Sequence, residues 1–273
     1  MTAFRAACIQ LRSSDDVAEN IRETVKLVRE AAARGASFIA TPENTSLMAP
    51  DGGAKLAQSF DEAHDPALPV FSALAKELNV WLLIGSLAIK VSDSKTANRS
   101  FLFAPDGTVA ARYSKIHLFD VALASGEVYR ESNTVAGGSE AVVADTALGA
   151  IGLTICYDVR FPQLYRSLAQ KGAFLFTVPS AFTVPTGEAH WHVLLRARAI
   201  ENGAFVIAPA QGGLHANGRK TYGHSLIVSP WGEVLAEAGT EPGVIIAEID
   251  PALSQQARAK VPNLQHDRAF AGP

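Results

Sequence analysis

The sequence is poor in cysteine, and this scarcity already excludes one class of protein. Only Cys8 and Cys156 occur among 273 residues, far apart and in unlike surroundings. This is not the regular spacing of a disulfide framework, and so little cysteine is typical of a reducing compartment. Long apolar runs are also missing, because no stretch reaches the roughly 20 residues of a membrane-spanning helix. The first residues turn polar too early for a signal peptide, so we expect a cytoplasmic protein.

An excess of positive charge is missing as well. The chain carries 24 Lys and Arg against 27 Asp and Glu, a net charge of −3. Without a basic surface there is little to attract nucleic acid or anionic lipid, so we expect neither as a partner. The seven histidines are scattered, and no metal-binding motif or glycine-rich nucleotide loop occurs. We therefore expect no metal and no cofactor.

Apolar runs and helical periods alternate along the chain. The composition, 48% hydrophobic and 19% charged, suits a well-packed globular protein that needs no metal or disulfide to stabilise its core. In the first half the patterns predict strands at residues 4–11, 37–40 and 80–86, and helices that begin at Asp15 or Asp16 and at Pro69. In the second half they predict strands at residues 150–155, 174–178 and 204–208, and helices at residues 162–171 and 190–202. This order predicts sheets with parallel strands and with helices packed on them.

Each half ends in a predicted hairpin of similar design. Residues 101–103 and 109–113 flank a turn with Pro105 and Gly107, and residues 225–228 and 233–236 flank a turn with Pro230 and Gly232. This similarity indicates an internal repeat, in which two similar sheets pack face to face with helices outside. The prediction is an α/β fold, a four-layer αββα sandwich with two mixed sheets inside. We place this domain at residues 1–250, and residues 251–273 form a C-terminal tail.

Three residues with reactive side chains follow predicted strands. Cys156 ends the strand at residues 150–155 and precedes a helix that Pro162 opens, a position where ligands often bind and where the helix dipole favours a thiolate. Glu43 and Lys115 also come directly after strands. Taken alone, either of them is typical of a solvated surface charge, and Cys156 is equally compatible with a structural role. Cys8 lies in the middle of a strand and fits a small buried hydrophobic residue.

These positions belong to three motifs that closely resemble the Glu–Lys–Cys signature of the nitrilase superfamily of carbon–nitrogen hydrolases. The motifs are Pro42-Glu43, Tyr113-Ser114-Lys115-Ile116-His117-Leu118 and the segment from Ile155 to Pro162. The resemblance covers nearly the whole chain and implies the αββα fold and a homodimer or larger homo-oligomer, in which the C-terminal tail at residues 251–273 packs on a partner subunit. It also implies that Glu131 matches a second family glutamate, which orients the base and the lysine.

The resemblance implies thiol-dependent hydrolysis of an amide. Cys156 would be the nucleophile and Glu43 the base, and Lys115 with the backbone N–H of Tyr157 would stabilise the oxyanion. A papain-like enzyme with His117 or His224 as the base is a rival reading. A catalytically silent binding scaffold is another.

Further segments resemble the Nit branch, and within it the deaminated glutathione amidases. They are residues 179–182, 186–191, 194–201, 210–213, 222–225 and 230–232. This resemblance implies a small anionic amide as substrate; the alternative is an ω-amidase acting on 2-oxoglutaramate, or another small-molecule amidase. Glu188 and His192 depart from the branch pattern, which has proline and glutamate there. We expect substrate contacts from Tyr157, Arg160, Ser180, Phe182, His190 and Trp191, with Arg160 as the cation for a substrate anion.

Overall fold

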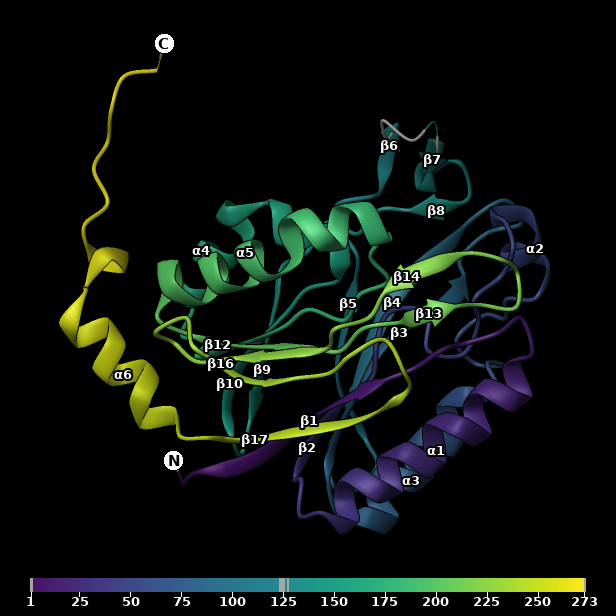
Figure 1. The fold of residues 1–273 in the computed structure, drawn as a ribbon, viewed down its shortest axis with the longest axis horizontal. Helices are drawn as coiled ribbons and strands as arrows, with labels where there is room; N and C mark the ends of the chain where they lie inside the picture. The colour runs from purple at the N-terminus through teal and green to yellow at the C-terminus, as the bar shows by residue number, and fades with distance from the viewer. Residues whose placement is uncertain (1, 123–125, 127, 273) are drawn as a thin grey trace.

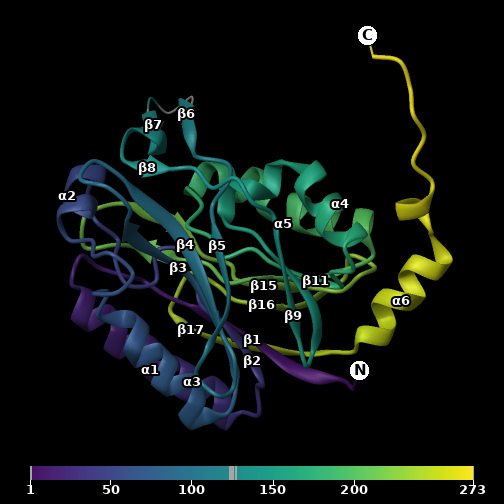
Figure 2. The same cartoon turned by 180° about the vertical axis from the view of Figure 1, so that it is seen from behind.

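Two mixed β-sheets pack face to face at the centre of the computed structural model, which describes residues 2–122, 126 and 128–272 (Figure 1, Figure 2). The first sheet runs in the order β17 (Gly243–Ile249), β1 (Phe4–Gln10), β2 (Phe38–Ala40), β3 (Trp81–Lys90), β4 (Thr96–Phe103) and β5 (Val109–Ser114), with β8 (Val135–Ala136) beside β4. The second runs in the order β16 (Val234–Glu237), β15 (Leu226–Val228), β12 (Phe205–Ala208), β11 (Leu175–Thr177), β10 (Gly149–Leu153) and β9 (Val142–Thr146).

Helices cover the outer face of each sheet. Helices α1 (Val17–Ala33) and α3 (Ala67–Leu78) lie on the first sheet, and α4 (Pro162–Gln170) and α5 (Val184–Asn202) lie on the second (Figure 1). Helix α1 begins where the Asp16 side chain accepts a hydrogen bond from the Glu19 N–H, and it ends before Gly35, whose φ of 85° is readily adopted only by glycine. The layers confirm the predicted four-layer αββα sandwich.

The two sheets repeat one topology, as the similar hairpins predicted. Strands β1, β2 and β3 are parallel and β4 and β5 follow antiparallel, just as β10, β11 and β12 are parallel and β15 and β16 follow antiparallel. The turns match in detail, since Gly107 and Gly232 have φ of 88° and 86°. The Gly107 N–H donates to Ala104 and the Gly232 N–H donates to Ser229 at 2.9 Å in both turns.

Several short elements were not predicted. They are α2 (Gly52–Ala57), β6 (Asp120–Ala122), β7 (Val128–Arg130), β8, β9, β13 (Gly212–Leu214), β14 (Lys220–Tyr222) and the 3₁₀ turns η1 (Glu131–Asn133), η2 (Cys156–Arg160) and η3 (Asn263–Gln265). Helix α5 starts at Val184 rather than at His190. The reason is that Pro185 lies in the first helical turn, where proline needs no N–H partner, and Gly187 packs tightly against Tyr222.

The C-terminal segment beyond residue 250 begins with a helix anchored on its own chain. In α6 (Pro251–Lys260), Arg258 donates to the carbonyl oxygens of Asn202 at 3.0 Å and of Ala173 at 2.5 Å. Beyond α6, Asn263 and Asp267 still form hydrogen bonds with α5 and α4 of the same chain. The last residues run away from the two-sheet body (Figure 1), and the side chain of Phe270 is 89% exposed.

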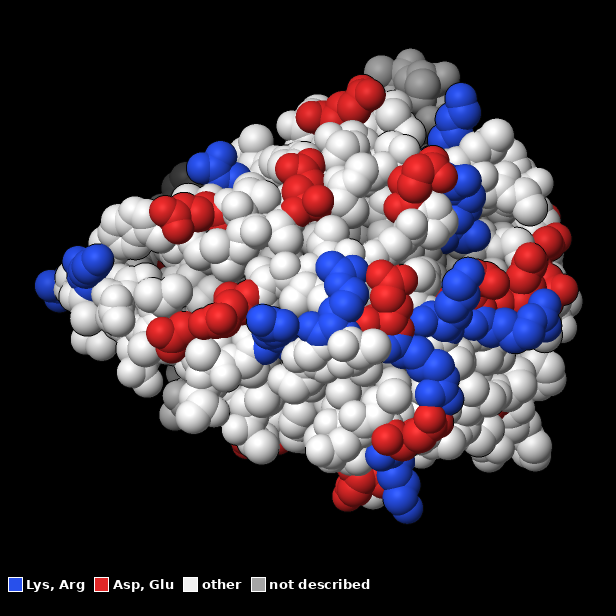
Figure 3. Space-filling model, turned by 60° about the horizontal axis from the view of Figure 1, so that its bottom comes forward, with Lys and Arg blue, Asp and Glu red and all other residues white. Residues whose placement is uncertain are grey.

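Charges of both signs are mixed on the face shown in Figure 3. Ion pairs join neighbouring elements on the surface, for example Arg29 of α1 and Glu77 of α3 at 2.5 Å. Among the described residues, no helix has the length and apolar character needed to cross a membrane.

Candidate active site

A buried ion cluster joins the residues that follow β2 and β5. The Lys115 Nζ lies 3.0 Å from the Glu43 Oε1 and 2.8 Å from the Glu131 Oε2. The side chains of Lys115 and Glu43 are only 2% and 5% exposed. Charges removed from water are tolerated only when they are paired and hydrogen-bonded, so each member of this cluster requires the others.

Asn98 of β4 completes this cluster and was not singled out in the sequence. Its Nδ2 donates to the Glu43 Oε1 at 2.9 Å and to the Glu131 Oε1 at 3.2 Å, so one amide orients both carboxylates. Glu131 accepts a further bond from the Phe119 N–H at 2.7 Å. The available signal was weak, because Asn98 lies in the polar first part of β4 beside Arg99 and Ser100, and only its type as an amide sets it apart.

Cys156 lies on a sharp turn at the carboxyl end of β10. Its φ of 48° is in the left-handed region, which non-glycine residues rarely adopt, and its N–H donates to the Pro179 carbonyl at 2.9 Å. The following residues form η2, so the thiol begins a helical turn as predicted. Cys156 is 7% exposed, whereas Cys8 is fully buried in β1, as expected for a structural residue.

Asp158 ties the nucleophile turn to the lysine segment. Its fully buried carboxylate accepts hydrogen bonds from the Tyr113 hydroxyl at 2.7 Å and from the N–H groups of Ile155 at 2.8 Å and His117 at 3.1 Å. The His117 Nδ1 lies 2.7 Å from the same carboxylate, and the ring stacks on Phe161. This clamp fixes the distance between the segments that carry Cys156 and Lys115.

The electrostatics of the cluster suit a carboxylate base and a neutral thiol. Burial alone would raise the pKa of Glu43, but the charge and hydrogen bond of Lys115 hold it below its ordinary value. Burial raises the pKa of the Cys156 thiol above its ordinary range, and the charge of Glu43 adds to this rise. Burial alone would lower the pKa of Lys115, yet the charges of Glu131 and Glu43 raise it well above normal. At neutral pH, Glu43 is therefore ionised, Lys115 is charged and the thiol is protonated.

One cavity of about 370 Å³ exposes all four predicted catalytic residues. Glu43, Lys115, Glu131 and Cys156 share its wall. Aromatic residues form much of the rest, and they are Phe119, Tyr129, Tyr157 and Phe182. Such a volume lies within the range of roughly 300–1,000 Å³ that is typical of small-molecule sites.

The predicted substrate contacts divide into two groups. Tyr157, Arg160 and Phe182 line the cavity, with the Arg160 guanidinium 5.9 Å and 5.6 Å from the two ring centres. Ser180, His190 and Trp191 do not line it.

The second group lies behind or beside the cavity wall. Ser180 is fully buried, and its hydroxyl donates to the Val178 carbonyl at 3.0 Å. Trp191 is 1% exposed and packs behind Phe182, with ring centres 4.8 Å apart. His190 is exposed, and its Nδ1 lies 3.2 Å from the Arg160 Nη2.

The cavity also holds cations that the sequence did not indicate. Lys55 of α2 donates to the Asn44 Oδ1 at 2.8 Å, and Arg219, between β13 and β14, donates to the Ala181 carbonyl at 3.0 Å. The buried Arg219 Nε has no hydrogen-bond partner among the described residues. Both residues line the cavity, as does Arg130, which gives it a positively charged side.

A histidine base finds no support in this geometry. The described residues that line the cavity include no histidine. His117 is held by Asp158, and the His224 Nδ1 lies 2.9 Å from the Glu237 Oε1. His192 also contacts Glu237, so this departure from the branch pattern leaves the cavity's charge unchanged.

Comparison with known proteins identifies the family of the chain. Residues 5–259 match the carbon–nitrogen hydrolase family. A deaminated glutathione amidase of Synechocystis sp. (strain PCC 6803 / GT-S) is 43% identical over 97% of this chain and 98% of its own. Omega-amidase NIT2 of Homo sapiens is 35% identical over 98% of this chain and 96% of its own.

A solved structure is also similar throughout the fold. The crystal structure of the C. elegans NitFhit protein aligns with a TM-score of 0.92 at 34% identity. The alignment covers 98% of this chain and 66% of that longer chain. The resemblance stated from the sequence motifs is confirmed, and the chain belongs to the carbon–nitrogen hydrolase family of enzymes.

Proposed function

We propose that the protein hydrolyses the amide bond of a small anionic metabolite through a thioester on Cys156, and that this metabolite is deaminated glutathione. The observation that carries the proposal is one cavity that combines Cys156 and the Glu43–Lys115 pair with several cations. A catalytically silent scaffold would have no need to keep a thiol, a carboxylate and an ammonium together out of water.

Acylation would begin with proton transfer. Glu43 takes the thiol proton as the sulfur attacks the amide carbon, because the raised pKa of Cys156 keeps the resting thiol protonated. Lys115 and the Tyr157 N–H stabilise the oxyanion of the tetrahedral intermediate. The C–N bond then breaks, Glu43 returns its proton to the departing amine, and a thioester remains.

Deacylation would use the same carboxylate. Glu43 accepts a proton from water, which attacks the thioester and releases the acid while the proton returns to the sulfur. With deaminated glutathione the products are cysteinylglycine and 2-oxoglutarate. The overall reaction consumes one water molecule and needs no cofactor.

The charge and size of the cavity favour this substrate class. Deaminated glutathione carries a keto acid at one end and a peptide carboxylate at the other, and Arg160, Arg219 and Lys55 supply cations on the wall. An unpaired cation out of water is costly, so such a site rejects neutral analogues. The same keto acid end occurs in 2-oxoglutaramate, which is smaller and leaves more of the cavity unfilled.

A substrate panel tests the proposal. We expect the highest kcat/KM for deaminated glutathione, a lower value for 2-oxoglutaramate, and the lowest values for neutral aliphatic amides and nitriles. Equal efficiency with a neutral amide would contradict the assigned substrate class and leave the chemistry of Cys156 intact.

Replacing Lys55 with Met is expected to raise KM for the anionic substrates by about tenfold or more, which is about 1.4 kcal/mol. The change removes a cavity cation and keeps most of the side-chain volume. KM for a neutral amide is expected to change little. Lys26→Met is the matched control, because Lys26 is exposed on α1. Equal KM increases for anionic and neutral amides would contradict a role in anion binding.

The same residue predicts a pH effect on binding. Burial lowers the pKa of Lys55 below its ordinary value of 10.5, although the charges of Glu131 and Glu43 oppose this. Lys55 therefore loses its charge at a lower pH than an ordinary lysine does. KM for the anionic substrate should rise with alkaline pH in the wild type and rise less in Lys55→Arg, since arginine stays charged.

We further propose a homodimer formed by the face that joins α5, the turn at residues 229–232 and α6. Val193, Ile200, Trp231 and Leu253, on these three elements, expose 68%, 53%, 57% and 43% of their surface, and Ile200 of α5 lies beside Gly232 of the turn. Hydrogen bonding between Arg196 of α5 and the Gly232 carbonyl at 2.8 Å makes this surface continuous. A face of this kind can pair with its own copy about a two-fold axis.

Negative charge introduced on this apolar face should separate the subunits. In sedimentation experiments at micromolar concentration we expect a dimer for the wild type and a monomer for the double variant Ile200→Glu, Trp231→Glu. Val91→Glu is the control, because Val91 is 47% exposed but follows β3 in the other sheet. A monomeric wild type, or a double variant that remains dimeric, would contradict the proposed interface.

A further inference from the structure

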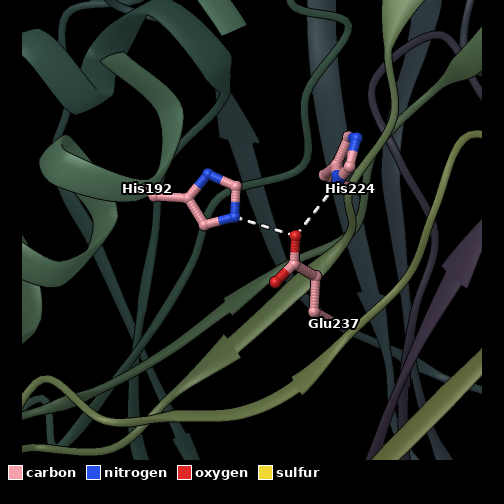
Figure 4. A group of neighbouring side chains, drawn as sticks. All are labelled: His192, His224 and Glu237. Atoms are coloured by element: carbon pink, nitrogen blue, oxygen red, sulfur yellow. Dashed lines mark hydrogen bonds and ion pairs between the residues drawn. The ribbon is translucent and has the colours of Figure 1, made fainter. Parts of the chain in front are cut away.

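Two histidines and a glutamate converge outside the catalytic cavity. His192 lies on α5, His224 precedes β15 and Glu237 ends β16, and their side chains point toward one another (Figure 4). The Glu237 Oε1 is 2.9 Å from both the His192 Nε2 and the His224 Nδ1. Among the described residues, this is the group of three potential ligands whose donor atoms all lie within 4.8 Å of one another.

We propose that His192, His224 and Glu237 bind a zinc ion. Two imidazoles and one carboxylate form a ligand set typical of Zn²⁺, whereas Ca²⁺ and Mg²⁺ prefer oxygen ligands throughout. Three protein ligands leave the fourth tetrahedral position to water. Nothing in the proposed amide hydrolysis uses these residues, so the zinc site is a separate function of the chain.

Two of the three distances between ligand atoms are close to those that zinc requires, and the third, between the two nitrogens, is at most 4.8 Å. Ligand atoms about 2.0–2.1 Å from a tetrahedral ion lie about 3.3 Å from one another. The two N···O distances of 2.9 Å are slightly shorter, so an outward shift of the carboxylate admits the ion. Such a shift meets little resistance, because the Glu237 side chain is 38% exposed. The imidazole rings are 66° apart in plane and 6.0 Å between centres, so their nitrogens approach from different directions.

His224 is held in a conformation that directs its ring to this point. Its φ of 54° is uncommon for a residue other than glycine, and such strain often marks a functional position. The His224 N–H donates to the Gly239 carbonyl at 2.8 Å, and its own carbonyl accepts from the Trp191 Nε1 at 2.7 Å. The ring stacks on Tyr222 with centres 4.4 Å apart. These contacts fix the ligand before metal binding, which lowers the entropic cost of forming the site.

The test measures zinc binding by the full-length, tag-free chain with Cys156→Ala, which removes the accessible thiol as a competing ligand. Calorimetry should show one Zn²⁺ per chain, and Co²⁺ should give the visible spectrum of a tetrahedral nitrogen and oxygen site. Zinc should also raise the melting temperature, because it joins α5 to β16 and binds only the folded state.

Ligand variants identify the site. His192→Gln, His224→Asn and Glu237→Gln, each in the Cys156→Ala background, should weaken zinc binding by at least tenfold; asparagine suits the left-handed backbone of residue 224. His64→Gln is the matched control, since His64 contacts Asp61 at 2.8 Å on the surface in the same kind of ion pair. Melting curves without zinc check that every variant is folded.

Each outcome of the zinc measurements either supports or overturns the proposed site. Unchanged zinc affinity in folded ligand variants, or no binding by the parent chain at submillimolar Zn²⁺, would overturn the zinc site. Loss of binding in His64→Gln together with the ligand variants would assign the uptake to surface histidines in general and overturn it too. Because the parent chain is inactive, none of these results depends on the proposed amidase activity.

Discussion

Replacing Cys156 with alanine is expected to abolish amide hydrolysis, with a fall in kcat of about 10⁴-fold or more. The Cys156 sulfur is the only atom in the proposed mechanism that can carry the acyl group. Without it the substrate can still bind, but no thioester can form. Acid-quenched wild type should show one acyl adduct by intact mass, and Cys156→Ala should show none. The fold should persist, because alanine removes a single sulfur from the turn.

Cys8→Ala is the matched control for this experiment. Cys8 is fully buried in β1, and its pKa is raised by burial, so its thiol stays neutral and inaccessible. We expect near-normal kcat and an unchanged acyl adduct in this variant. Full turnover in Cys156→Ala, or an adduct that remains there, would show that Cys156 is not the nucleophile.

Replacing Lys115 with arginine is expected to lower kcat by about 100-fold or more. The compact ammonium group that donates to the oxyanion is replaced by a larger, planar guanidinium group, for which the pocket has no room. The space is limited on both sides by the carboxylates of Glu43 and Glu131, at 3.0 Å and 2.8 Å from the Nζ. Lys90→Arg is the control, since Lys90 is 40% exposed at the end of β3. Near-normal turnover in Lys115→Arg would remove Lys115 from the catalytic machinery.

Replacing Lys115 with methionine tests how Lys115 and Glu43 balance each other's charge, and the measured quantity is the free energy of unfolding at several pH values. In the wild type, Lys115 holds the pKa of Glu43 below its unfolded value, so this stabilisation is present at neutral pH and is lost as the pH falls through the folded pKa. Without the lysine, burial raises the pKa of Glu43 instead. A raised carboxyl pKa favours the folded state at low pH and destabilises it as the pH rises. Urea unfolding should therefore show that the free energy of unfolding of the variant falls, relative to the wild type, as the pH rises from acidic to neutral.

The resemblance of three motifs, rather than local order alone, predicted that Glu43, Lys115 and Cys156 belong to one site, and the structure places all three in one cavity wall. Their positions along the chain agree with that prediction. Glu43, Lys115 and Cys156 directly follow apolar strands, and the carboxyl ends of strands are where functional side chains meet. The same reasoning could not find Lys55 or Arg219. Lys55 lies on the short helix α2, which has too few residues for a hydrophobic period, and Arg219 lies in the connection of a small hairpin.

The sequence also could not separate cavity residues from those that support them. The segment containing Ser180, His190 and Trp191 was correctly expected near the cavity, but the direction of each side chain depends on α5, whose start at Val184 was not predicted. His117 was a candidate base on sequence grounds. Its hydrogen bond to Asp158 depends on two segments 41 residues apart, a contact that no local pattern encodes.

The repeated topology has a consequence for how activity arises during folding. Glu43 and Lys115 follow strands of the first sheet, and Cys156 follows a strand of the second. Each half can form its own hydrogen-bonded strands, yet neither half contains a complete set of reacting groups. Recovery of turnover after denaturation therefore reports the docking of the halves, whereas circular dichroism reports the earlier formation of their secondary structure. A folding intermediate with two formed but undocked sheets would be spectroscopically native-like and chemically inert.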